Sequence, residues 1–198
     1  MGSTELTTES LVKRIRGGER LKFLYFWGHT ARREGEIGPA CLSQWWPSRF
    51  TADGVEYATA EHWMMAEKAR IFGDEEAERQ AVEAPHPALA KKAGRLVRGF
   101  SEEIWARERF AIVVAGSVHK FSQDPRLRSY LLSTGDRVLV EASPMDRIWG
   151  IGLAADDARV SDPARWRGRN LLGFALMEAR ERLRAAVPSS APGGDVGA

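Results

Sequence analysis

The sequence predicts a mainly α fold: a compact, single, helix-dominated α+β domain with a few short strands. Helix-capping residues precede most of the periodic segments, and roughly half of the chain falls in predicted helices. Strand-like patterns are confined to a few short stretches. The 198 residues, 43% hydrophobic and 28% charged, have the length and composition of one ordinary globular domain.

The first quarter of the chain is predicted to contain one short helix and one aromatic strand. Residues 1–20 form an expected N-terminal extension whose short helix ends at Gly17-Gly18. Residues 22–27, Lys-Phe-Leu-Tyr-Phe-Trp, are predicted to be a strand that is buried on at least one face. A polar, glycine-rich surface loop is expected to follow at 28–39.

The middle of the chain starts with a predicted hairpin and continues in helices. Asp53-Gly54 separates two short apolar runs, which indicates a tight turn. Thr59 is a suitable cap for a helix that runs to about Phe72, and Gly73 supplies its end. Further helices are predicted to begin after Asp74, at Pro87, after Ser101, at Asp124-Pro125 and, near the end of the chain, after Asn170.

The clearest predicted strand is residues 137–142. Val138 and Val140 lie on one face of this strand, and Leu139 and Glu141 on the other. The domain is expected to span residues 21–186. The remaining residues, 187–198, are rich in Pro, Ser and Gly and are expected to be a disordered tail.

Composition and motifs exclude several classes of protein. The net charge of +2 does not favour a broad nucleic-acid footprint, and the single cysteine, Cys41, precludes an intrachain disulfide. No signal peptide or membrane span is recognisable, so we expect a cytoplasmic protein without a membrane partner. The chain contains no HExxH, paired CxxC, phosphate-binding glycine loop or GxSxG motif. We therefore expect neither a metal nor a cofactor.

The helix predicted after Thr59 carries the first candidate site. At about 100° per residue, one stripe of this helix holds Glu61, Met64, Met65, Lys68 and Phe72. The carboxyl and the amine are separated by about two turns, roughly 10 Å, so both can lean toward one small group held between them. The alternative is that Glu61 and Lys68 belong to a solvated face of the helix. The apolar residues on the same stripe argue against this alternative.

Two later stretches carry further candidate residues. Residues 143–152 follow the clearest strand and contain Asp146, Trp149 and Gly150, in a position where loops commonly carry function. Asn170 begins the last helix, close to arginines that could favour phosphate or could be plain surface charges. Trp46, in a segment that returns to the core, either stacks on a ring or fills the core.

Taken in order, several short motifs resemble the YbiA-like/NADAR superfamily of N-glycosidases over roughly residues 22–185. The matching residues are Glu61-His62 with Lys68, Lys91/Lys92-Ala-Gly-Arg95, Lys120-Phe121, Thr134-Gly-Asp136, Leu139-Val-Glu141, Ser143-Pro-x-Asp146, Ile148-Trp-Gly-Ile-Gly-Leu153 and Trp166-x-Gly-x-Asn170-x-x-Gly173. The resemblance implies a compact helical fold and cleavage of a bond between a nitrogen and ribose C1. The chain departs from the family pattern at Gln44-Trp45-Trp46-Pro47 and at Trp63-Met64-Met65.

The resemblance also implies substrates and residue roles. The substrates would be phosphoribosylamino-pyrimidine intermediates of riboflavin synthesis or ADP-ribose attached to guanine, with ADP-ribosylated nucleic acid as a further candidate. Glu61 or Asp146 would supply a proton or stabilise charge, and Lys68 would attack C1, with Lys91 and Lys92 as rivals. The candidate substrate-binding residues are Trp46, His62, Arg95, Trp149, Gly150 and Asn170.

Four alternatives to these assignments stay open. His62 could be a hydrogen-bonded structural residue, and Lys68 could stay charged and neutralise a phosphate. The whole domain could bind ADP-ribose or a related nucleotide without cleaving it. The sequence does not separate binding from cleavage, because both need the same pocket. The fourth alternative is a structural helical protein whose charged stripe contacts a partner.

Overall fold

A computed structural model describes residues 6–31 and 33–186. Its elements are α1 (Thr8–Arg16), β1 (Phe23–Phe26), the 3₁₀ helix η1 (Pro39–Leu42), β2 (Phe50–Ala52), β3 (Val55–Tyr57), α2 (Ala60–Ile71), α3 (Glu75–Glu83), α4 (Pro87–Arg95), α5 (Glu102–Gln123), α6 (Pro125–Ser133), β4 (Val138–Glu141), η2 (Pro163–Arg165) and α7 (Leu171–Ala185). The mainly α fold with a few short strands is confirmed. The tail predicted to be disordered, 187–198, lies outside the described residues.

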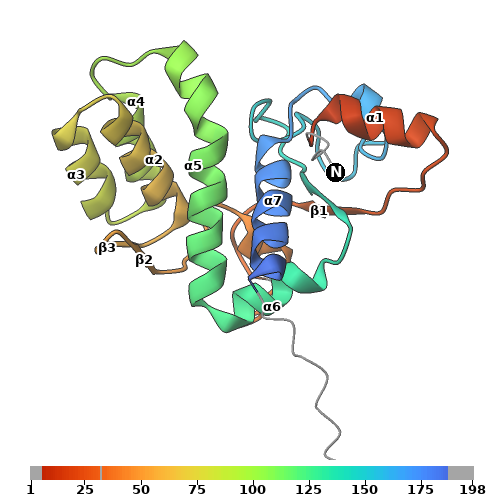
Figure 1. Ribbon diagram of the computed structural model, residues 1–198, viewed down its shortest axis with the longest axis horizontal. Coiled ribbons are helices and arrows are strands. Elements are labelled where there is room, and N and C mark those ends of the chain that lie inside the picture. The colour runs from red at the N-terminus through yellow and green to blue at the C-terminus, as the bar shows by residue number, and fades with distance from the viewer. Residues whose placement is uncertain (1–5, 32, 187–198) are drawn as a thin grey trace, which may run out of the picture.

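The long helix α5 stands at the centre of the molecule (Figure 1). On one side it packs against α2, which is in contact with α3 and α4. On the other side it packs against α7, which in turn covers β4. Helix α1 and strand β1 lie beyond α7 in this view. Helix α5 therefore joins two groups of elements that are far apart in the sequence.

The strands form two separate pairs. β1 and β4 run parallel, with Phe23 opposite Val138 and Phe26 opposite Glu141. β2 and β3 form the predicted hairpin, whose turn residues Asp53 and Gly54 both have positive φ, 50° and 78°. Positive φ at both central positions matches the right-handed twist of a two-residue hairpin.

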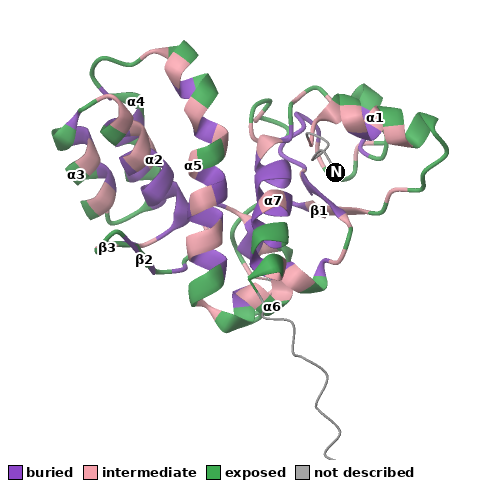
Figure 2. Cartoon of the chain, in the orientation of Figure 1, coloured by how far each residue is buried: buried purple, intermediate pink, exposed green. Residues whose placement is uncertain are grey.

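Burial is greatest in helices α2 and α7 and in strand β4, whereas β1 is mostly half-buried (Figure 2). Helix α2 is buried on every side between residues 60 and 66, and Val138, Leu139 and Val140 of β4 are at most 1% exposed. Among the described residues, no helix has both the length and the apolar run needed to cross a membrane.

The predicted helix starts are confirmed, but two capping side chains have other roles. Asp74, Ser101 and Asp124 each accept a backbone N–H in the first turn of the helix that follows. Thr59 instead pairs its hydroxyl with Nδ1 of His62, at 2.7 Å. Asn170 adopts a left-handed conformation with φ 54° and does not cap α7 with its side chain. These two prediction errors concern side-chain contacts, and the helix boundaries still hold.

Candidate active site

A cavity of about 340 Å³ lies where α2 and α4 meet the loop that follows β4. Its walls come from six separate parts of the chain. The lining residues are Ser43, Gln44, Trp45, Glu61, Met64, Met65, Lys68, Lys91, Gly94, Arg95, Trp105, Glu141, Asp146, Ile148, Trp149 and Leu172.

Helix α2 contributes the stripe predicted from the sequence. Glu61, Met64, Met65 and Lys68 all line the cavity, whereas Phe72 does not. Helix α4 approaches this stripe closely, because a Cβ added at Gly94 would collide with the Met65 side chain. A glycine at this position therefore allows α4 to bring its basic residues to the same space.

The cavity wall contains buried polar atoms that lack a hydrogen-bond partner among the described residues. They are Oε1 and Nε2 of Gln44, Oε1 of Glu61 and Oε2 of Glu141. A buried polar atom without a partner costs folding free energy of about 1–3 kcal/mol. Several such atoms in the wall of one cavity indicate a site that a polar ligand would complete.

Glu61 is only 3% exposed, and its surroundings disfavour the ionised carboxylate. Burial is the main cause that raises its pKa to about 7, and the negative charge of Asp146 adds to this effect. Lys91, the Trp45 side chain and Arg95 act in the opposite direction. Near neutral pH, Glu61 can therefore exist in both protonation states.

Glu141 ends strand β4 and also lines the cavity. Its pKa is raised to about 8, mainly by burial and also by the negative charges of Asp146 and Glu61, while Lys91 acts in the opposite direction. At pH 7 this carboxyl is thus mainly protonated and can donate a proton into the cavity.

Lys68 extends from α2 into a partly apolar region of the site. Its Nζ donates a hydrogen bond to the Gly94 carbonyl oxygen at 2.7 Å and lies 4.1 Å from the centre of the Phe100 ring. Burial lowers the pKa of Lys68, and Glu102 partly opposes this shift. A lowered pKa increases the fraction of neutral, nucleophilic amine.

The loop after β4 is shaped by Asp146. Its Oδ1 accepts the backbone N–H groups of Ile148 at 2.8 Å and Trp149 at 2.7 Å. This turn orients Asp146 and Trp149, and both residues line the cavity. From α4, Lys91 and Arg95 complete the basic part of the wall.

Four predicted substrate-binding residues do not line this cavity: Trp46, His62, Gly150 and Asn170. Trp46 packs against the core. His62 is held by Thr59 and by the Ala84 carbonyl oxygen at 3.0 Å, as a structural residue would be. Asn170 is fully buried; it accepts the Glu141 N–H and donates to the Leu139 carbonyl oxygen.

Gly150 has a structural reason to be a glycine. A Cβ at this position would lie about 3 Å from the carbonyl oxygens of Glu141 and Asp146, so the glycine lets the loop fold back onto β4.

The structure distinguishes the two lysines that are alternatives to Lys68 as the nucleophile. Lys91 lines the cavity, whereas Lys92 is exposed and does not line it.

Sequence reasoning did not select every residue of the wall, and Gln44, Trp45 and Glu141 are the polar or aromatic residues among those missed that matter most to the site. The segment of Gln44 and Trp45 reaches the site because the buried Lys120 of α5 binds the carbonyl oxygens of Cys41 at 2.6 Å and Ser43 at 2.8 Å. The Gln44 carbonyl oxygen then accepts the Glu61 N–H at 3.0 Å. One available signal for Glu141 was a carboxyl group in an otherwise apolar strand.

Two buried carboxyl groups and a partly desolvated amine in the wall of one cavity form the type of site that enzymes use for acid–base and nucleophilic chemistry. Among the described residues, no group of three or more His, Cys, Asp or Glu side chains could hold a metal ion.

Comparison with known proteins places the chain in a family. Residues 25–184 match the NADAR domain family, and the chain belongs to it. It is 41% identical to "N-glycosidase R617" of Acanthamoeba polyphaga mimivirus over 81% of this chain and 95% of that protein. It is 33% identical to "Riboflavin biosynthesis protein PYRR, chloroplastic" of Zea mays over 72% of this chain but only 22% of that protein.

A solved structure supports the same relationship. The NMR structure of the E. coli protein YbiA is similar with a TM-score of 0.67 and 25% sequence identity, over 84% of this chain and 88% of YbiA. The YbiA-like fold predicted from the motifs is confirmed.

Proposed function

We propose that the chain is an N-glycosidase that hydrolyses the bond between ribose C1 and a base nitrogen. The observation that carries this proposal is the cavity that Glu61, Glu141 and Lys68 all line. Relatives named N-glycosidases, among them the mimivirus protein, support it.

The carboxyl groups suit the two needs of this reaction. Cleavage of the C1–N bond builds positive charge on C1 and the ring oxygen, which a nearby carboxylate stabilises. The departing nitrogen needs a proton, which a neutral carboxyl can donate. Glu141, with its pKa of about 8, suits the donor role, and Glu61 or Asp146 suits the role of the stabilising carboxylate.

Lys68 is the proposed nucleophile. Its neutral amine attacks C1, the C1–N bond breaks, and the bond electrons leave with the base nitrogen, which takes the proton from the carboxyl. Loss of the amine proton and opening of the ribose ring give an imine between Lys68 and C1. Water then hydrolyses the imine, which releases the sugar and restores the amine.

Two classes of riboside fit the site. One is ADP-ribose attached to guanine, free or within nucleic acid, and the other is the phosphoribosylamino-pyrimidines of riboflavin synthesis. Both carry a 5-phosphate group, for which the basic residues Lys91 and Arg95 at the cavity wall are suitable partners. The relative named for riboflavin biosynthesis supports the second class.

The decisive experiment measures base release from both substrate classes, in the presence of EDTA, with the native protein and with Glu61→Gln. We expect release from at least one substrate and a loss of about 100-fold or more in the variant, because the variant lacks an ionisable group at the reacting bond. The circular dichroism spectrum of the variant should be unchanged. Tight binding of both substrates with no release would instead favour a binding module.

A further inference from the structure

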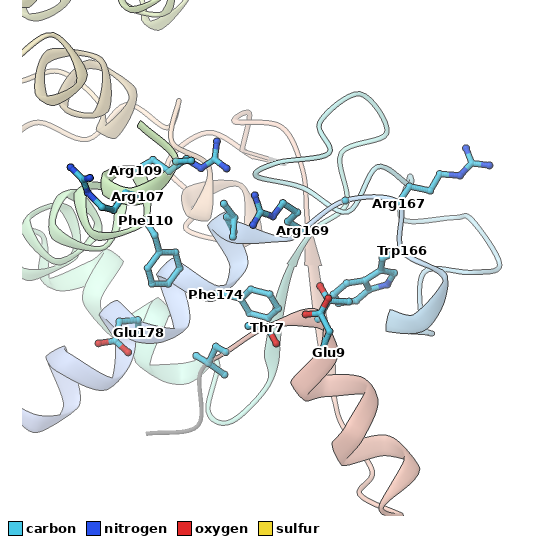
Figure 3. A pocket seen from close by; sticks show the side chains of 15 residues that line it. Thr7, Glu9, Arg107, Arg109, Phe110, Trp166, Arg167, Arg169, Phe174 and Glu178 are labelled. Atoms are coloured by element: carbon cyan, nitrogen blue, oxygen red, sulfur yellow. The ribbon is translucent and has the colours of Figure 1, made fainter. Parts of the chain in front are cut away.

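A second, larger cavity of about 830 Å³ lies between the start of α1, the first half of α5 and the start of α7. Figure 3 shows its walls, with Phe110 of α5 and Phe174 of α7 on one side and Trp166 on the other. We call this cavity the arginine groove, because Arg107, Arg109, Arg167 and Arg169 line it.

Arg109 is the unusual member of the groove. It is 4% exposed, and its Nε has no hydrogen-bond partner among the described residues. Within the described part of the chain, its one ion pair is a 3.3 Å contact with Glu102, whose own side chain is 66% exposed. A buried guanidinium with unused donors is costly unless an anion completes its hydrogen bonds.

Arg169 supplies a second guanidinium to the same space. In Figure 3 the guanidinium groups of Arg109 and Arg169 point toward each other, whereas those of Arg107 and Arg167 point away from the centre. The side chain of Arg169 is exposed and makes no ion pair within the described part of the chain. Two convergent guanidinium groups match the geometry of a phosphate group.

The acidic residues of the groove leave this positive charge in excess. Glu9 and Glu178 also line it, and Glu178 is paired with Arg182 at 3.0 Å. The start of α7 supplies no free backbone donor at Leu171 and Leu172, because their N–H groups already bind the carbonyl oxygens of Ile148 and Trp149. The side chains of the two convergent arginines are donors that an anion in the groove could use.

We propose that the arginine groove is a second binding site, which takes the phosphate of a nucleotide between Arg109 and Arg169. The half-buried rings of Phe110 and Trp166 would contact its base. Arginine beside aromatic rings is the combination that binds the phosphate and base of single nucleotides in a strand. The ligand is either a free nucleotide or a unit of a nucleic-acid strand.

The position of the groove relates it to the candidate active site. Trp105 and Leu172 line the active-site cavity, and their neighbours in sequence, Ala106 and Leu171, line the groove. The two sites thus share the walls formed by α5 and the start of α7. A strand bound in the groove would lie beside the cavity that takes the riboside.

The test is a titration with AMP and with a short single-stranded oligonucleotide, followed by NMR. The Trp166 indole N–H reports on the groove and the Trp149 indole N–H on the active-site cavity. Arg169→Gln is the test variant and Arg167→Gln its matched control, with the same loss of charge on a side chain that points away. Both residues are exposed, so both variants should fold.

We expect both ligands to shift the Trp166 signal, and Arg169→Gln to weaken AMP binding about tenfold, against less than about twofold for Arg167→Gln. If the oligonucleotide binds at least about tenfold more tightly than AMP, the ligand is a nucleic-acid strand. If the oligonucleotide and AMP bind with equal affinity, the ligand is a free nucleotide. The proposal is overturned if the Trp166 signal does not move, or if the two variants weaken binding equally. Neither outcome depends on N-glycosidase activity.

Discussion

Glu61 and Glu141 are two buried carboxyl groups that line one cavity, and the negative charge of Glu61 raises the pKa of Glu141. Lys91 lowers the pKa of both residues. This arrangement keeps one proton available near neutral pH while a second carboxyl can stay ionised. It resembles in principle the paired carboxyls of other glycosidases, in which different surroundings separate an acid from a stabilising base.

Replacement of Glu141 by Gln should change how stability depends on pH. The folded-state pKa of about 8 lies above the ordinary value of 4.5, so the contribution of the neutral carboxyl is complete below pH 4.5 and is lost as the pH rises to 8. Glu141→Gln removes this loss, at most about 1.4 kcal/mol for each pH unit in that window. The measurement is the free energy of unfolding in urea, for the native protein and the variant, between pH 4.5 and pH 9.

Glu34 provides the control for this experiment, since it is an exposed carboxyl in a loop. The variant Glu34→Gln should follow the pH profile of the native protein. A Glu141→Gln variant whose stability falls with pH as steeply as that of the native protein would show that Glu141 ionises normally. If Glu141 is the proton donor, its variant should also lose about 100-fold or more in base release.

Lys68 should form the covalent intermediate. Borohydride reduces an imine to a stable amine, so substrate plus borohydride should add a reduced sugar to the peptide that carries Lys68, detectable by mass spectrometry. Lys68→Met should abolish the adduct. An adduct on Lys91, the other lysine that lines the cavity, or no adduct in an active preparation, would contradict this role.

At the scale of secondary-structure elements, local signals in the sequence were sufficient to place most boundaries. Asp74, Ser101 and Asp124 cap the helices for which they were selected, because capping depends on residues three positions away. The roles of Thr59 and Asn170 were missed, because their side chains bind partners that the local pattern does not reveal. Asn170 binds β4, which is 29 to 31 residues away in sequence.

The contact of α7 with β4 depends on a glycine, so Gly173→Ala should destabilise the protein. A Cβ at Gly173 would collide with the Leu139 carbonyl oxygen and with the amide of Asn170, neither of which can move freely. We expect a loss of about 1–3 kcal/mol in the free energy of unfolding. Thermal unfolding, with a shift of about 2–4 °C per kcal/mol, measures it.

Gly38→Ala is the matched control. Gly38 has φ −153°, and a Cβ there would meet no atom within 4 Å. The Gly38→Ala substitution should therefore leave the melting temperature almost unchanged. Equal melting temperatures for Gly173→Ala and the native protein would mean that α7 and β4 are less closely packed than the structure indicates.

At the scale of the whole molecule, the sequence could predict one wall of the site but not its assembly. The stripe on α2 follows from helical periodicity within a single segment. Gln44, Trp45 and Glu141 reach the cavity through the Lys120 contacts and the parallel pairing of β1 with β4, which join segments about 80 to 115 residues apart. The arginine groove likewise combines residues from the start, middle and end of the chain.

A ligand in the active-site cavity should therefore protect distant parts of the chain together. Ribose 5-phosphate is the unit that both candidate substrates share, and hydrogen exchange with mass spectrometry can follow its binding. We expect slower exchange in residues 43–45, 61–68, 91–95 and 141–149, by up to about 100-fold at a concentration 100 times Kd, since binding then stabilises by about 2.7 kcal/mol. The β2–β3 hairpin, whose residues do not line the cavity, serves as the internal reference. Protection confined to 91–95 would mean that the phosphate binds α4 alone and that the cavity does not hold the ribose.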